Sequence, residues 1–184
     1  MDLKAIYIVG SGGHSRSIQS LLDNRELPIV TIGPEAAVEE EVFLSQKLFE
    51  SRILNGIGFY QNSLNIRIKT YNRYKSDGFN FENLVASSAI VKTSTNCAGL
   101  QIFEQVYIGP NVSFGDNVVV NTAAVVEHDC VIEDSCFISP GALVLGSARI
   151  GEGAFIGAGA IIFPKVSISK GVVIPAGTVV SKDT

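Results

Sequence analysis

The chain has 184 residues, of which 46% are hydrophobic and 17% are charged, and its formal net charge is −4. This composition excludes a disordered chain, and the acidic balance removes the basic field that nucleic acids and anionic membranes require. We therefore expect a compact protein with a small-molecule substrate and no nucleic-acid partner.

The first apolar run, residues 5–9, reaches Gly10 too early to form the core of a secretion signal. No apolar stretch approaches the roughly 18 residues that a membrane-spanning helix needs. We therefore expect a cytoplasmic protein without a membrane span.

Strand-like and helical patterns alternate in the first half of the chain. They predict strands at residues 5–9, 27–32, 52–57 and 80–85, and helices at residues 15–24, 35–50 and 65–75. Strands that alternate with helices build a parallel sheet. Residues 1–83 are therefore predicted to form a small Rossmann-like α/β domain, shorter than a complete dinucleotide-binding fold.

A glycine turn follows the first predicted strand: Gly10, Ser11, Gly12, Gly13 and His14. Between a strand and a helix, such a turn places backbone N–H groups and the positive end of the helix dipole where a phosphate can bind. The turn predicts a nucleotide-diphosphate site, with a tight turn that binds nothing as the alternative. An NAD site fits less well, because Ser15 stands at the third glycine position of the dinucleotide motif and Gly33-Pro34 replaces the ribose-binding acid.

From residue 84 onward, a large apolar residue recurs every six positions, with a single polar exception at Asn96. The series is Leu84, Ile90, Asn96, Ile102, Ile108, Phe114, Val120, Val126, Ile132, Ile138, Val144, Ile150, Ile156, Ile162, Ile168, Ile174 and Val180. A small or β-branched residue follows four positions after most of them. This period predicts a parallel β-helix of hexapeptide repeats over residues 84–184, with every step equal to six, and it excludes a β-sandwich.

The chain has two histidines, and His128 is the better candidate for proton transfer. It follows the inward Val126 by two positions and is flanked by Glu127 and Asp129, so we expect it on the surface of the coil. A neighbouring carboxylate can fix the imidazole tautomer. The alternative is an ordinary solvated turn histidine.

The sequence lacks the residues that a metal site or a serine or cysteine nucleophile would require. One β-helix histidine does not make a three-histidine metal site, and Gly-x-Ser-x-Gly and Cys-x-x-Cys nucleophile signatures are missing from the sequence. Cys97, Cys130 and Cys136 form no even set, which is typical of reduced thiols, and Cys130 and Cys136 occupy small inward positions. We therefore expect no metal and favour general-base catalysis.

The sequence resembles the bacterial sialic acid O-acetyltransferase-like group, which includes N-acetyltransferases of nucleotide-linked 4-amino sugars. The likeness covers nearly the whole chain. It lies in residues 6–14, 65–67 with 78–79, 121–122, 126–132, 138–142 and 151–159.

The resemblance implies a left-handed β-helix that assembles as a homotrimer, with acetyl-CoA between adjacent subunits and a nucleotide sugar on the N-terminal domain. It implies His128 as the general base, Asp129 as its carboxylate partner and Gly146 as a backbone donor near the thioester. It places coenzyme contacts at Ser139, Gly141, Gly146, Gly157, Ala158 and Lys165, and sugar-nucleotide contacts at Gly10, Ser11, Gly12, Gly13, His14, Gly58 and Asn121.

The leading hypothesis is an acetyl-CoA-dependent N-acetyltransferase acting on a nucleotide-linked amino sugar for bacterial surface glycan synthesis. A sugar O-acetyltransferase of the sialic acid type uses the same base and remains an alternative. A non-catalytic nucleotide-sugar-binding subunit is a third hypothesis, because Phe137 stands where some relatives have a second histidine that contacts the donor.

Overall fold

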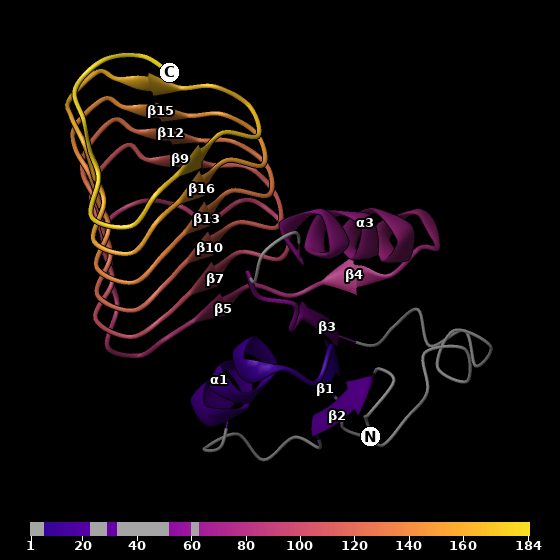
Figure 1. Ribbon diagram of the computed structural model, residues 1–184. Coiled ribbons are helices and arrows are strands. Elements are labelled where there is room, and N and C mark those ends of the chain that lie inside the picture. The colour runs from indigo at the N-terminus through magenta and orange to yellow at the C-terminus, as the bar shows by residue number, and fades with distance from the viewer. Residues whose placement is uncertain (1–5, 23–28, 33–51, 60–62) are drawn as a thin grey trace. The chain divides into compact units, whose positions relative to one another are not determined.

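The computed structural model describes residues 6–22, 29–32, 52–59 and 63–184. It divides into two compact units, Met1–Glu82 and Asn83–Thr184. Figure 1 colours the chain from its N-terminus to its C-terminus and labels several elements of each unit. The predicted helix at residues 35–50 and the Gly33-Pro34 pair lie outside the described residues. None of the described helices is long and apolar enough to cross a membrane.

The first unit contains a parallel four-stranded sheet in the order β2-β1-β3-β4. Its elements are β1 (Ile6–Val9), α1 (Gly13–Leu22), β2 (Ile29–Ile32), β3 (Arg52–Asn55), α3 (Ser63–Ser76) and β4 (Asn80–Phe81). This order places β1 and β3 side by side, with β2 and β4 outside them. The prediction of a small Rossmann-like α/β domain is confirmed.

The core of this unit comes from the apolar faces of its strands and helices. Ile18 and Leu22 on α1 are fully buried, four residues apart as a helix face requires. On α3, Tyr71 and Tyr74 pack against Phe79 and Phe81, with the Tyr71 and Phe81 ring centroids 4.5 Å apart. Aromatic rings in this cluster anchor α3 to β3 and β4.

The second unit is a parallel β-helix of two-residue strands on three faces. Face I contains β5 (Leu84–Val85), β7 (Gln101–Ile102), β10 (Val119–Val120), β13 (Phe137–Ile138), β16 (Phe155–Ile156) and β19 (Val173–Ile174). Face II contains β6 (Ile90–Val91), β8 (Tyr107–Ile108), β11 (Val125–Val126), β14 (Leu143–Val144), β17 (Ile161–Ile162) and β20 (Val179–Val180). Face III contains β9 (Ser113–Phe114), β12 (Val131–Ile132), β15 (Arg149–Ile150) and β18 (Ser167–Ile168). Figure 1 shows the coils stacked in chain order.

From β6 onward, the second residue of each strand points inward, and these residues with the small residues of the corners form one continuous core. The prediction of a hexapeptide β-helix is confirmed. A residue with positive φ recurs every six positions at the corners, from Gly99 to Gly177. Such backbone angles favour Gly, which occupies six of these positions, and Asn, which occupies two.

The first coil is one residue shorter than the others, and here the sequence-based register was wrong. Val85 pairs with Ile102, and the two numbers differ by 17, whereas Val120 pairs with Ile138, and these differ by 18. In the first coil, Val85, Val91 and Cys97 are therefore equivalent in register to the inward residues of later coils. Ile90 and Asn96 are not inward as predicted, whereas Leu84 is buried and Val85 is 37% exposed. Ile90 is 53% exposed, while Val91 and Cys97 contact the core. Asn96 is therefore not a polar residue in the core, because its side chain is exposed.

Two other boundaries differ from those predicted. The strand expected at residues 80–85 is two strands: β4 pairs with β3 in the first unit, and β5 pairs with β7 in the β-helix. Helix α1 begins at Gly13, two residues before the predicted start, because the Arg16 N–H already donates to Gly12 O at 3.2 Å. Gly13 and His14 thus belong to the first turn of the helix.

Candidate active site

His128 lies at the corner between faces II and III, in the turn that joins β11 to β12. Its side chain is 55% exposed, and its Nδ1 atom lies 2.7 Å from Oδ2 of Asp129. A carboxylate only accepts hydrogen bonds when ionised, so this contact selects the tautomer with hydrogen on Nδ1. In the neutral ring with this tautomer, Nε2 carries no hydrogen and can accept a proton.

Glycines lie against His128 from the coils on both sides. A Cβ atom placed on Gly146 would lie 2.6 Å from Nε2 of His128, and one placed on Gly109 would lie 2.7 Å from the His128 backbone nitrogen. Both distances are too short for real side chains. The ring therefore lies over the bare backbone of Gly146, and the absent side chain opens a path to Nε2.

The N–H of Gly146 has no acceptor among the described residues, whereas the neighbouring Ser147 N–H donates to His128 O at 2.9 Å. No hydrogen bond of the coil ladder among the described residues uses this Gly146 N–H group. The group is available to a ligand next to the imidazole ring.

Asp129 is held by two side chains. Its Oδ2 contacts His128, and its Oδ1 accepts a hydrogen bond from the Asn111 side chain at 3.1 Å. These hydrogen bonds, the one with His128 first, lower the pKa of the Asp129 carboxyl below its usual value. The carboxylate is thus kept ionised beside the imidazole.

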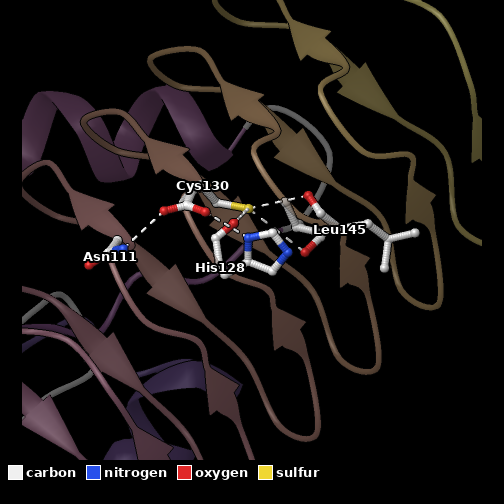
Figure 2. A network of polar contacts seen from close by, with 6 residues as sticks. Asn111, His128, Cys130 and Leu145 are labelled. Atoms are coloured by element: carbon white, nitrogen blue, oxygen red, sulfur yellow. Dashed lines mark hydrogen bonds and ion pairs between the residues drawn. The ribbon is translucent and has the colours of Figure 1, made fainter.

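Cys130 fills the inner side of the same corner. Its Sγ lies 3.3 Å from Leu145 O and 3.7 Å from His128 O. Figure 2 shows this network, with His128 drawn between Asn111 and Leu145. Burial raises the pKa of the Cys130 thiol, so it stays protonated and packs as a small apolar residue.

The predicted coenzyme contacts fall on two separate corners. Gly146 and Lys165 share the His128 corner, where the Lys165 N–H donates to Gly146 O at 3.0 Å. Four other predicted coenzyme residues and one predicted sugar contact lie at the corner between faces I and II: Ser139, Gly141, Gly157, Ala158 and Asn121. Within one chain, face II separates the two groups.

The predicted nucleotide site lies where β1 and β3 end side by side. Gly56 N–H donates to Val9 O at 2.8 Å, which joins the two strand ends. A Cβ atom on Gly58 would lie 2.8 Å from the Cβ of His14, and one on Gly10 would lie 3.2 Å from the backbone carbon of Gly56. The structure thus brings the glycine turn, His14 and Gly58 together. In parallel sheets, ligands bind at the carboxyl ends of such strands.

Arg67, to which the sequence assigned no role, supports this loop from beneath. It is fully buried, and its Nη1 donates to the carbonyls of Asn55 at 2.9 Å and Ile57 at 2.8 Å. The Asn55 side chain donates in return to Arg67 O at 3.1 Å. Burial lowers the pKa of Arg67 to about 9, which leaves the guanidinium charged at neutral pH.

The sequence did not predict the contributions of Asn111 and Arg67 to the two sites. Asn111 precedes Asp129 by one full coil of 18 residues, so stepping by coil length from the catalytic candidates would have found it. The described residues contain no cluster of three or more His, Cys, Asp or Glu side chains that could hold a metal ion.

The fold and the repeat define a hexapeptide-repeat β-helix protein. The Bacterial transferase hexapeptide (six repeats) family matches residues 129–164. No curated protein sequence matches the chain.

Three solved structures resemble nearly the whole chain. The acetyltransferase domain of PglB from Neisseria gonorrhoeae is 27% identical, with a TM-score of 0.87 over 98% of this chain and 92% of that one. PerB from Caulobacter crescentus, in complex with CoA and GDP-perosamine, is 29% identical, with a TM-score of 0.87 over 98% of this chain and 90% of that one. WeeI from Acinetobacter baumannii is 20% identical, with a TM-score of 0.75 over 96% of this chain and 95% of that one, which shows the fold alone. The chain is thus similar over nearly its whole length to the acetyltransferase domain of PglB and to PerB.

Proposed function

We propose that the protein is an acetyl-CoA-dependent N-acetyltransferase that acts on a nucleotide-linked amino sugar for bacterial surface glycan synthesis. The observation that carries this proposal is the His128 corner, where Nδ1 faces the Asp129 carboxylate at 2.7 Å and Nε2 lies over Gly146. Similarity to PerB, which was solved with CoA and GDP-perosamine, and to the PglB domain, which was solved with acetyl coenzyme A, supports the two substrates.

In the proposed reaction, the sugar amine attacks the thioester carbonyl of acetyl-CoA. Nε2 of His128 takes the proton that the amine loses, and the Asp129 carboxylate stabilises the imidazolium that forms. The free N–H of Gly146 donates to the oxyanion of the tetrahedral intermediate. The C–S bond then breaks, and the imidazolium returns the proton to the departing thiolate of CoA. No covalent acyl-enzyme forms.

We propose that the N-terminal unit holds the nucleotide at the joined ends of β1 and β3. Residues 10–14 present backbone N–H groups and the N-terminus of α1, where a diphosphate is stabilised by the helix dipole. Gly58 offers a surface without a side chain beside His14, and the buried Arg67 holds the loop that carries it. The Asn121 corner is assigned to the sugar.

We propose a homotrimer with active sites between subunits. The outward residues of face II form an unbroken apolar row: Ile90, Tyr107, Val125, Leu143, Ile161 and Val179. The outward row of face III is more polar: Ser113, Val131, Arg149 and Ser167. An apolar row is typical of subunit contacts. Contacts along face II would bring the Ser139 and Gly157 corner of one subunit toward the His128 corner of its neighbour.

The function is tested by measuring the release of free CoA thiol from acetyl-CoA with a panel of UDP-, dTDP- and GDP-linked amino sugars. We expect release with one amino sugar, and no release with the matching hydroxy sugar. Release with the hydroxy sugar alone would instead support O-acetylation. Thermal stabilisation by a nucleotide sugar, without any thiol release, would support the binding subunit and overturn the proposal.

A further inference from the structure

Asn111 lies one coil before Asp129, at the equivalent position of the same corner. Both residues have left-handed backbone angles, with φ values of 58° for Asn111 and 59° for Asp129. Because the two turns have the same conformation and stack in register, their side chains leave the corner in parallel. The Asn111 amide consequently meets the Asp129 carboxylate, with 3.1 Å between Nδ2 and Oδ1.

The direction of this hydrogen bond is set by chemistry. An ionised carboxylate has no hydrogen to donate, so the amide nitrogen of Asn111 is the donor. Asp129 thus receives a hydrogen from Asn111 on Oδ1 and from His128 on Oδ2. Because each oxygen accepts a hydrogen bond, the carboxylate cannot rotate without breaking one of the two bonds.

We propose that Asn111 is a positioning residue, which orients the Asp129 carboxylate and thereby holds His128 in the tautomer with Nε2 as the free base. This inference rests on the proposed function of His128, and it adds a residue that touches neither substrate. The Asn111 hydrogen bond is also one of the causes that lower the pKa of Asp129.

Two substitutions separate the side chain of Asn111 from its backbone role. Asn111→Gly removes the amide and keeps the left-handed angle without strain. Asn111→Asp keeps the shape, but it replaces the donor with a like charge that repels Asp129. Gln105→Gly is the matched control, because Gln105 is exposed and has a φ of 59° at another corner.

The tautomer of His128 gives a readout that does not depend on activity. The chain contains only one other histidine, His14, so a His14→Gln variant assigns the imidazole nitrogen signals in an NMR spectrum. We expect the Nδ1–H form to dominate in the wild type, and to lose population to the Nε2–H form in Asn111→Gly and further in Asn111→Asp. Gln105→Gly should leave the populations unchanged.

In the thiol-release assay, Asn111→Gly should lower kcat by about 3- to 10-fold, with a smaller change in either KM, and Asn111→Asp should lower it further. Unchanged tautomer populations in both Asn111 variants would overturn the inference, even if His128→Ala abolishes activity. If the wild-type protein released no thiol with any substrate of the panel, the proposed function would be contradicted. The tautomer measurement would still decide the role of Asn111.

Discussion

Gly146 and Gly109 touch His128 from opposite sides, and an added methyl group should act differently at each position. At Gly146 the methyl group would meet the imidazole ring, which can rotate away, with its nearest atom at 2.6 Å. At Gly109 it would meet the backbone of Glu127 and His128, which cannot. We therefore expect Gly146→Ala to lower kcat by about 10-fold or more with little change in Tm.

Gly109→Ala should instead lower the free energy of unfolding, by about 1–3 kcal/mol, because the coil must move to accept it. Thermal unfolding and thiol release, measured on both variants, check the two expectations. A Gly146→Ala variant with wild-type turnover would show that the ring position does not limit the reaction.

The three thiols are expected to be inert in the folded protein. Burial raises the pKa of Cys97 to about 11 and that of Cys136 to about 12, and it raises that of Cys130 in the same direction. The thiolate is the reactive form, so a raised pKa keeps these groups protonated until the pH approaches those values. Ellman's reagent at pH near 8 should detect almost no protein thiol before denaturation and all three afterwards. Rapid labelling of the folded chain would contradict this burial.

At the scale of the element, the shorter first coil gives opposite expectations for two neighbouring residues. Cys97 contacts the core and lies near Asp116 and Asp134, whereas Asn96 is exposed. Cys97→Asp should therefore cost about 2–3 kcal/mol of unfolding free energy, because it buries a charge beside two carboxylates. Asn96→Asp should change it by less than about 0.5 kcal/mol. Urea unfolding of both variants tests this register. If Asn96→Asp were the more destabilising variant, Asn96 rather than Cys97 would be the inward residue, as the uninterrupted six-residue period predicted.

The loop after β3 depends on Arg67. Arg67→Ala removes two hydrogen bonds to the carbonyls of Asn55 and Ile57 and leaves a cavity, so we expect a loss of about 2–4 kcal/mol. Hydrogen–deuterium exchange of residues 55–59 should rise, while Lys69→Ala, an exposed position on the same helix, should have no such effect. Unchanged exchange in Arg67→Ala would mean that the loop keeps its conformation without the hydrogen bonds from Arg67.

The sequence predicted the elements well where their pattern repeats. The six-residue period of the apolar residues located the strands from Ile102 onward, because each inward residue is fixed by contacts to the coils on both sides. It failed in the first coil, which pairs with another coil of the β-helix on one side only and tolerates a shorter step. The start of α1 was missed because the glycine turn itself supplies the carbonyl of Gly12 to the first helical hydrogen bond.

At the scale of the molecule, the apolar row on face II predicts the interface. Ile161→Asp places a charge in the middle of this row, and it should dissociate the proposed trimer and abolish thiol release together. Val131→Asp, an apolar outward position on face III, should leave the assembly intact. Light scattering coupled to gel filtration measures the mass of each variant. A wild-type protein that is a monomer at working concentration would contradict the inter-subunit site.

The candidate site could be predicted from the sequence only in part. His128 and Asp129 are adjacent in the chain, so their contact could be predicted from the sequence. The glycine turn could be predicted from its composition. Gly58 was expected from the resemblance, and Asn111 could have been found by stepping back one coil of 18 residues from Asp129. Arg67 contributes through contacts to the loop after β3, and the sequence pattern does not encode the path of that loop.

The measurement that tests the central claim most directly is the turnover of His128→Ala with acetyl-CoA and the amino sugar that the wild type accepts. Because the His128 side chain is largely exposed and outside the core, the variant should keep the fold and the oligomeric state of the wild type. Turnover should fall by about 10²-fold or more. A correctly folded variant with unchanged turnover would show that His128 is not the general base.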